Sequence, residues 1–183
     1  MSFRLRMFWP FSLLILGSLI LSYVVLSSVL YQETTGQART NGLRYLQHID
    51  WLVHRELDIE DADRLQQTLK DVGQRLNLRI TYVDGAGKVL ADSGVLQEAI
   101  SGLENHAQRP EIQEAMHSGT GHSMRYSSTL QTSFVYVALR IDPLFGSQPA
   151  ALRVAMPMAQ IQSALDRVKG EFALFLAAML ILA

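Results

Sequence analysis

Glutamate and histidine are the residues of this sequence whose spacing comes nearest to metal chemistry. Glu114 and His117 lie three positions apart in a segment with helical character, and side chains at this spacing share one face of a helix. His106 or His122 would have to supply a third ligand. A Glu-x-x-His pair alone is a weak motif, and such residues are commonly solvated surface, so we expect no metal site.

A second group of residues suits the binding of a small anion. Tyr82, Arg125 and Tyr136 lie on predicted strands, and an arginine on the inner side of a sheet favours a carboxylate or phosphate because its guanidinium forks onto both oxygens. On the solvent face the same residues would be ordinary surface. Alternation places Tyr136 and Arg140 on one face of their strand. The opposite face is aliphatic and is expected to be core: Val135, Val137, Leu139 and Ile141.

Other polar residues are interpreted as structural. Four of them lie in loops at the ends of elements and are expected to cap backbone N–H groups: Asp92, Ser93, Asn105 and His106. Arg109 precedes Pro110 and is expected to pair with Glu111 or Glu114.

Several classes of chemistry are excluded or disfavoured. The chain has no cysteine, which excludes disulfides, thiol catalysis and cysteine-based zinc sites. The net charge of -1 and the lack of a basic block give no reason to expect nucleic acid as a partner. No Ser-His-Asp set, acidic pair or glycine-rich ATP site stands out, so we predict no catalytic residue and no cofactor in this chain.

The elements that would position these residues begin with an apolar run. Met7 to Gln32 contains 26 residues without a charge, behind Arg4 and Arg6. At about 1.5 Å per residue such a helix crosses a bilayer, and the two arginines favour a cytoplasmic N-terminus with the following residues exported. The run is longer than the hydrophobic part of a signal peptide. A second run from Phe172 to Ala183 predicts the first part of a second crossing, and thus a fragment of a longer protein.

Between these runs the spacing of the apolar residues changes from helical to strand-like. Helical stripes at Leu43, Leu46, Ile49 and Val53, and at Leu65, Leu69, Val72 and Leu76, predict two packed helices, with the acidic patch after Leu57 capping the second one. Strands are then predicted at 78–83, 89–92, 123–127, 134–141 and 151–156, with a turn at 84–88, a hairpin loop at 142–149 and a helix from Pro110 to Gly119.

After Pro157 a heptad seam runs into the second apolar segment. Its members are Met158, Ile161, Leu165, Val168 and Phe172. The predicted organisation is a cytoplasmic N-terminus at 1–6, a transmembrane helix at 7–31, an extracytoplasmic domain at 32–157 (helices at 32–77, sheet with inserted helices at 78–157), a signalling helix at 158–171 and the start of a second transmembrane helix at 172–183.

Four strings in order, YVDGAGKVLADSG, LENHAQRPEIQEAM, RYSSTL and FVYVALRI, resemble the extracytoplasmic sensor region of phosphate-regulon-type sensor histidine kinases. The resemblance implies an α+β fold of the PAS-like Cache (PDC) type: a five-stranded antiparallel sheet and a long N-terminal helix, flanked by transmembrane helices. It also implies a homodimeric, multi-pass protein of the inner membrane. Its kinase core, beyond residue 183, would use ATP and Mg²⁺ and phosphorylate a response regulator.

Other outputs remain open at this point. The same kind of sensor region also serves chemotaxis transducers and cyclic-dinucleotide synthases, and an anchored binding module without enzymatic output is a further alternative. The stimulus is expected to be a small anionic ligand or a partner membrane protein. His54, followed by Arg55 and Glu56, comes nearest to a phosphoacceptor, but the expected orientation keeps it outside the cell, away from ATP.

Overall fold

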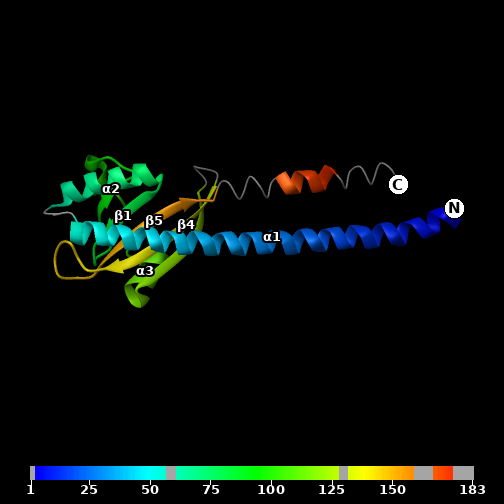
Figure 1. Ribbon diagram of the computed structural model, residues 1–183, viewed down its shortest axis with the longest axis horizontal. Helices are drawn as coiled ribbons and strands as arrows, with labels where there is room; N and C mark the ends of the chain where they lie inside the picture. Colours follow the sequence, from blue (N-terminus) through cyan, green and yellow to red (C-terminus); the bar gives the residue numbers. More distant parts are fainter. Residues whose placement is uncertain (1–2, 57–60, 128–131, 159–166, 175–183) are drawn as a thin grey trace. The chain divides into compact units, whose positions relative to one another are not determined.

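The computed structural model describes residues 3–56, 61–127, 132–158 and 167–174, shown in Figure 1. Two compact units make up the chain. The sheet unit comprises Gln37–Gln162, and the apolar-helix unit comprises Met1–Gly36 together with Ser163–Ala183. Each is described by itself below.

The apolar-helix unit holds the first part of helix α1 (Phe3–Trp51). By length and composition, this helix could cross a membrane, since an 18-residue window within Leu13–Arg55 has a mean hydropathy of 2.4. Hydroxyl groups within it donate to carbonyls of the preceding turn, as Ser28 does to Val25 at 2.8 Å, which satisfies these donors inside the helix. Tyr23 stacks on Phe172, with ring centroids 5.4 Å apart.

In the sheet unit α1 continues with an apolar stripe facing the core. Leu46, Ile49 and Val53 are all buried, as the helical spacing predicts. The helix ends in a single π-helical segment, η1 (Leu52–Glu56). Helix α2 (Ala62–Leu76) follows.

Helix α2 is capped at both ends by residues whose types favour helix termini. The carboxylate of Asp61 accepts a hydrogen bond from the backbone N–H of Arg64 at 2.8 Å, and Asn77 ends the helix in the left-handed conformation with φ of 53°. Leu65 and Leu69 are fully buried. The prediction for Leu76 was wrong: it is 40% exposed, because it lies in the last turn, where the helix leaves the core.

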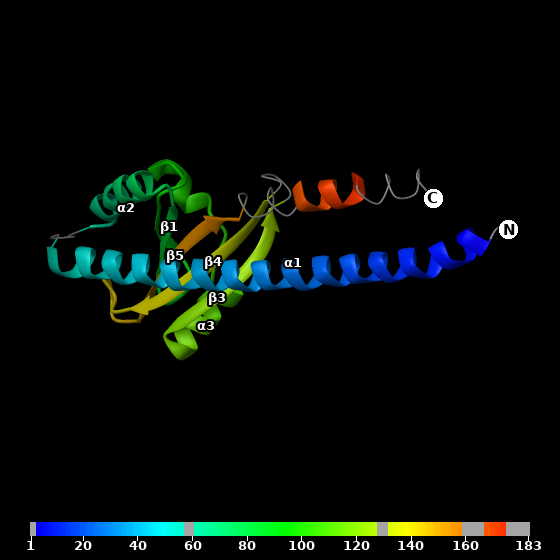
Figure 2. The same ribbon diagram turned by 45° about the vertical axis from the view of Figure 1, so that its right-hand side comes forward.

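Five antiparallel strands form one sheet, which confirms the predicted fold class. The strands are β1 (Arg79–Val83), β2 (Val89–Asp92), β3 (Thr120–Ser127), β4 (Thr132–Ile141) and β5 (Ala150–Pro157). Their order across the sheet is β2-β1-β5-β4-β3, so the strand that is last in the chain lies at the centre (Figure 2).

Local turn chemistry joins these strands as the sequence predicts. The Asp84 carboxylate accepts hydrogen bonds from the N–H groups of Ala86 and Lys88, and Gly87 adopts φ of +83°. Between β2 and β3 lie the 3₁₀-helix η2 (Gln97–Gly102) and helix α3 (Pro110–Ser118). Pro110 occupies the first turn of α3, and Gly119, at φ of +92°, caps its end.

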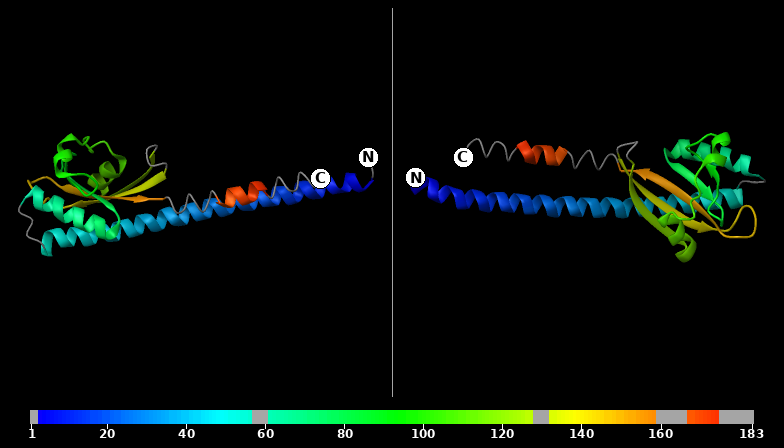
Figure 3. Two further views of the ribbon diagram at one scale, coloured as in Figure 1. Left: turned by 90° about the horizontal axis from the view of Figure 1, so that it is seen from above. Right: turned by 180° about the vertical axis from the view of Figure 1, so that it is seen from behind.

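The two faces of the sheet are covered by different elements (Figure 3). Helices α1 and α2 pack on one face, over strand residues that include Val137, Leu152 and Val154. Helix α3 and η2 pack on the other, over Ala138 and Ala151. We call these the α1 face and the α3 face.

The heptad seam can be followed only in part. Met158 is buried, and its N–H donates to the carbonyl of Ser133 at 2.8 Å. Val168 and Phe172 belong to a helical stretch at 167–174. Ile161 and Leu165, and residues 175–183 of the expected second crossing, lie outside the described residues, so the seam remains a prediction.

Candidate functional site

Polar side chains gather on the α3 face because the strand register places them in one row. Thr81 is paired with Asp92 on one side and with Arg153 on the other. The Thr81 hydroxyl donates to the Asp92 carboxylate at 2.8 Å and accepts from Nη2 of Arg153 at 3.1 Å. Arg79 completes this side by donating from Nε to the same carboxylate at 2.9 Å.

Glu111, in the first turn of α3, brings a second carboxylate to the row from above. Its side chain is fully buried. One oxygen accepts from Nη2 of Arg125 at 2.7 Å and lies 3.4 Å from Nη1 of Arg153, and the other accepts from the hydroxyl of Ser123 at 2.5 Å. A single carboxylate therefore joins α3 to two strands, β3 and β5.

Small residues beneath α3 permit this close approach. A Cβ atom on Gly121 would collide with the backbone carbonyl of Glu111, and would lie 2.7 Å from the N–H nitrogen of Ala115. Ala138, paired with Gly121 in the neighbouring strand, is fully buried. The backbone of α3 thus rests directly on β3, which is why the short Glu111 side chain reaches the arginines.

The ring of Tyr136 lies under both arginines. The guanidinium carbon of Arg125 is 4.1 Å from the ring centroid and that of Arg153 is 5.2 Å away, both within the range of cation–π attraction. We call this group the arginine cluster; it comprises Arg79, Thr81, Asp92, Glu111, Ser123, Arg125, Tyr136 and Arg153.

Burial and neighbouring charges shift the pKa values of Glu111 and Arg153 in opposite directions. Burial alone raises the pKa of Glu111, but the hydrogen bond from Ser123 and the charges of Arg125 and Arg153 outweigh it, so the pKa is lowered and the carboxylate stays ionised. Burial lowers the pKa of Arg153, and the charges of Glu111 and Asp92 oppose this. An arginine remains protonated in either case.

His106 lies beside the cluster as a buried neutral histidine. Its Nδ1 is 2.8 Å from the carbonyl of Glu104, and its backbone N–H donates to Gly87 at 2.7 Å. Burial, and then the charge of Arg153, lower the pKa of His106. The imidazole therefore resists protonation where an exposed histidine would titrate.

One donor of the cluster is unsatisfied. Arg153 is only 4% exposed, and its Nε is a buried side-chain nitrogen without a hydrogen-bond partner in the part of the chain that the structure describes. Buried donors without acceptors are rare in folded proteins, and each one calls for an explanation. Three guanidinium groups also face only two carboxylates in this cluster.

The structure brings two of the three candidate ligand residues together. Arg125 and Tyr136 meet on the α3 face, whereas Tyr82 lies on the α1 face. The Tyr82 hydroxyl accepts from the N–H of Leu144 at 3.0 Å, and burial raises its pKa. Sequence reasoning assigned no role to Arg153, and it placed Glu111 only as a partner of Arg109.

Three of the four polar loop residues accept hydrogen bonds from backbone N–H groups, whereas the His106 ring contacts the carbonyl of Glu104. Asp92 accepts from the N–H of Gly94, and the Ser93 hydroxyl accepts from the N–H of Ile80. Asn105 accepts from the N–H of Ala107, and its amide donates to the carbonyl of Ala86. Asp92 does more than this, because it also holds Thr81 and Arg79.

Two expected polar contacts are replaced by others. Arg109 pairs with Glu104 at 2.9 Å rather than with Glu111 or Glu114, since Glu111 points under the helix toward the sheet. Glu114 accepts from the backbone N–H of His122 and lies 3.4 Å from its imidazole.

No group of three histidine, aspartate or glutamate side chains suited to a metal ion occurs among the described residues.

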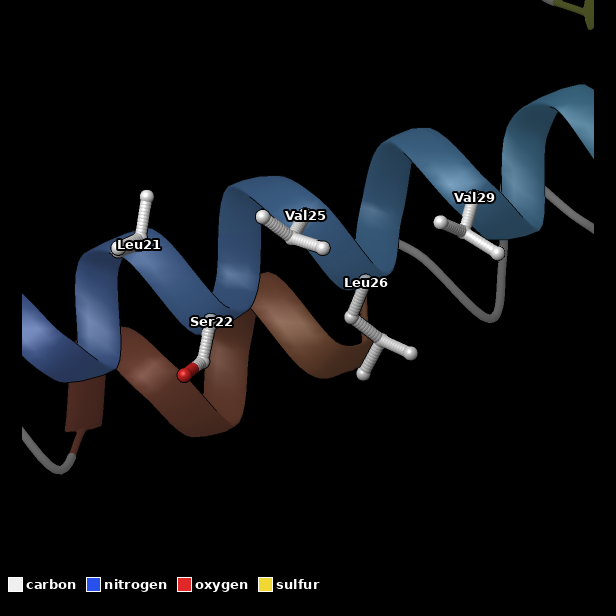
Figure 4. A pocket seen from close by; sticks show the side chains of 5 residues that line it. All are labelled: Leu21, Ser22, Val25, Leu26 and Val29. Carbon is white, nitrogen blue, oxygen red and sulfur yellow. The ribbon is translucent and has the colours of Figure 1, made fainter.

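Two pockets lie away from the cluster. One, of about 400 Å³, lies at the end of α1 and is lined by Asp50, Trp51, His54, Arg55 and Asp142. There His54 of η1 contacts the β4–β5 loop, with Nε2 3.1 Å from the carbonyl of Asp142. The other, of about 440 Å³, lies on the apolar part of α1, and four of its five lining side chains are aliphatic (Figure 4).

Comparisons with known proteins identify the fold. No family model matches the sequence, and no curated protein is significantly similar to it. Among solved structures, the sensor domain of the V. cholerae histidine kinase DctB matches with a TM-score of 0.60 and 17% identity over 82% of this chain. The sensory domain of the Campylobacter jejuni chemoreceptor Tlp3 with isoleucine bound matches with a TM-score of 0.52 and 14% identity over 79% of this chain.

The periplasmic domain of RsbU from Chlamydia trachomatis matches with a TM-score of 0.55 and 14% identity over 76% of this chain. This chain spans 59% of the DctB structure, 60% of the Tlp3 structure and 52% of the RsbU structure. At these identities the likeness concerns the fold. The chain has the fold of Cache-type sensor domains, with one N-terminal apolar helix of the kind that anchors an extracytoplasmic domain.

Proposed function

We propose that the chain is the signal-sensing and transmembrane-signalling region of a two-component sensor histidine kinase, of the phosphate-regulon type. The sheet unit lies outside the cytoplasm, the apolar part of α1 crosses the inner membrane, and a further crossing begins near Phe172. The parent protein is a homodimer that phosphorylates itself on a histidine, using ATP and Mg²⁺, and then phosphorylates a response regulator. The chain is its receptor part and takes no catalytic role.

The observation that carries this proposal is the continuity of α1. A single helix runs from Phe3 through the apolar segment to Trp51, and its last turns are buried against the sheet through Leu46 and Ile49. A change in the packing of the sheet therefore acts directly on the helix that enters the apolar segment. The fold shared with the sensor domain of a histidine kinase supports the same function.

The stimulus that fits the α3 face is a small anion. Arg125 is 30% exposed, and Nε of Arg153 has no acceptor among the described residues. Guanidinium groups bind carboxylates and phosphates with two parallel hydrogen bonds. The Tlp3 domain was solved with isoleucine, whose carboxylate is such a group. A partner membrane protein is the alternative stimulus.

The test starts with the gene beyond the codon for Ala183. The proposal expects a completed apolar span followed by a helix with a His-Glu phosphoacceptor. The full-length protein is then placed in lipid nanodiscs, and autophosphorylation is measured with Ile161, Leu165 and Val168 replaced by aspartate. Because these residues form the predicted seam, basal phosphorylation should change at least severalfold. Unchanged basal activity and an unchanged response would refute the mechanical link.

A chemotaxis transducer is the second candidate. Chemoreceptor sensory domains match this chain over nearly the same length as the kinase domain does, 79% against 82%. A long cytoplasmic coiled coil after the second span would favour this candidate, and a nucleotide-cyclase domain would favour a cyclic-dinucleotide synthase. A stop codon after the span would favour an anchored binding module.

A further inference from the structure

Glu111 satisfies the two arginines beside it unequally. It lies 2.7 Å from Nη2 of Arg125 but 3.4 Å from Nη1 of Arg153, and its second oxygen is engaged by Ser123. Arginine and carboxylate pair most strongly through two parallel hydrogen bonds. Arg153 receives one long contact from Glu111 and none at Nε, so this buried guanidinium could accept a better carboxylate partner than the one it has.

The cluster also carries more positive than negative charge. Arg79, Arg125 and Arg153 face the carboxylates of Asp92 and Glu111, and His106 beside them is held neutral. A further anion would balance the third guanidinium. Asp92 cannot provide this balance for Arg153 directly, because its oxygens are engaged by Arg79 and Thr81.

Arg125 gives solvent access to this buried arrangement. It is 30% exposed, whereas the Arg153 side chain is 5% exposed and Glu111 is fully buried. Both guanidinium groups lie over the ring of Tyr136. A small anion bound by Arg125 from the solvent side therefore lies next to Arg153, because both guanidinium groups contact the same ring.

We propose that Glu111 is a built-in occupant of a carboxylate site, and that a small free monocarboxylate entering beside Arg125 displaces it and bonds both Arg125 and Arg153. This inference names the ligand class and the regulation of the proposed sensory site, and to that extent it rests on the proposed function. The displaced Glu111 side chain turns into water together with the first turn of α3, whose neighbouring residues Pro110 and Gln113 are already exposed. The ligand thereby releases α3 from the sheet.

The first experiment measures binding of ¹³C-labelled acetate by NMR to the chain of residues 1–183 in phospholipid nanodiscs. Glu111→Ala leaves both guanidinium groups without their carboxylate and opens a space of about its size. We expect this variant to bind acetate at least tenfold more tightly than the unaltered chain. Glu114→Ala, on the same helix but in an exposed pair with His122, is the matched control and should bind acetate like the unaltered chain.

A second variant guards against loss of the fold. Glu111→Gln keeps the volume and one acceptor but removes the charge, and we expect a smaller gain in acetate affinity from it. Adding Arg125→Met to either variant should abolish the gain. The proposal is overturned if a folded Glu111 variant gains no affinity, if Glu114→Ala gains as much, or if the gain survives Arg125→Met.

Hydrogen exchange tests the release of α3 in the unaltered chain. Saturating acetate should increase amide exchange in residues 112–118 and leave α2 unchanged, whereas equal chloride should change neither. Increased protection of α3 would overturn the displacement. Tighter acetate binding by Glu111→Gln in a full-length protein that does not autophosphorylate would retain the carboxylate site and reject the kinase function. Altered autophosphorylation without tighter binding would do the reverse.

Discussion

The two faces of the sheet are held to their helices by different forces. On the α1 face, aliphatic side chains such as Leu46, Leu69 and Leu152 form the contact, and its buried polar residues Gln66 and Tyr82 are uncharged. On the α3 face, the fully buried Glu111 and the nearly buried Arg153 share the contact with small residues. Apolar packing is non-directional, whereas an ion pair depends on the position of each atom.

The two faces should therefore respond differently when their helices are displaced. Many small contacts keep α1 attached to the sheet over a range of small displacements. The few strong contacts of α3 either form in full or break, and a competing charged group can break them. A sensor needs both behaviours, since one face must respond to a ligand while the other carries the response to α1.

The largest expected effect comes from breaking the polar face. Arg153→Met leaves Glu111 with one arginine and removes a partner of Thr81, and breaking a buried ion pair costs about 3–5 kcal/mol. The free energy of unfolding is measured with urea in detergent, from the fluorescence of Trp51 in a Trp9→Phe background. Arg109→Met, which breaks only an exposed pair, should cost at most about 1 kcal/mol. Equal losses would contradict the comparison.

Truncating the apolar face should have an effect nearly as large. Leu46 of α1 is fully buried against the sheet, so Leu46→Ala removes apolar surface and leaves a cavity, at a cost of about 2–5 kcal/mol. Leu76→Ala is the matched control, since Leu76 is 40% exposed, and should cost about 0.5 kcal/mol or less. The Leu46→Ala loss should be independent of salt and of acetate. A salt-dependent loss would mean that the two faces are not separate.

The contact between α3 and β3 can be tested by one methyl group. Gly121→Ala forces the Glu111 carbonyl away, because the added Cβ has no space. Overpacking of this kind costs about 1–3 kcal/mol, and amide exchange in α3 should rise more than in α2. Gly102→Ala adds the same methyl group where no atom lies within 4 Å. A Gly121→Ala chain as stable as this control would show that α3 sits less tightly than described.

The smallest expected effect is a pH dependence of the polar face. The pKa of His106 is lower in the folded chain than its ordinary value of 6.5, so between these two values the unfolded chain binds more protons. Stability is therefore full above about pH 6.5 and declines as the pH falls toward the lowered pKa. His106→Gln should flatten this part of the stability profile, and the exposed His117→Gln should leave it unchanged. A slope that persists in His106→Gln would assign it to another group.

Local signals in the sequence predicted most of the fold. The turn at Asp84, the Pro110 start of α3 and its end at Gly119 each follow from the conformation that one residue type prefers. Alternation along β4 also separated the apolar side from the side of Tyr136. Each of these signals acts within a few residues of the chain.

The arginine cluster could be predicted only in part. Arg125 and Tyr136 were recognisable as polar residues on strands, but Glu111 and Arg153 are 42 positions apart, and their contact depends on strand order and register. Tyr82 was grouped with them because strand position alone does not say which face a residue occupies. An arginine inside the otherwise apolar strand Ala150–Pro157 was the one available signal, since a buried charge requires a partner.

The central position of β5 has a consequence for how the chain folds. Strands β1 and β2 form one antiparallel pair and β3 and β4 another, each from residues close in sequence. Strand β5 is made last and joins the two pairs through β1 and β4. During synthesis at about 5–20 residues per second, both of these strand pairs are therefore made before residue 150 emerges. Cooperative folding of the sheet must await the final strand, and Arg153 can leave water only when Glu111 is already in place to receive it.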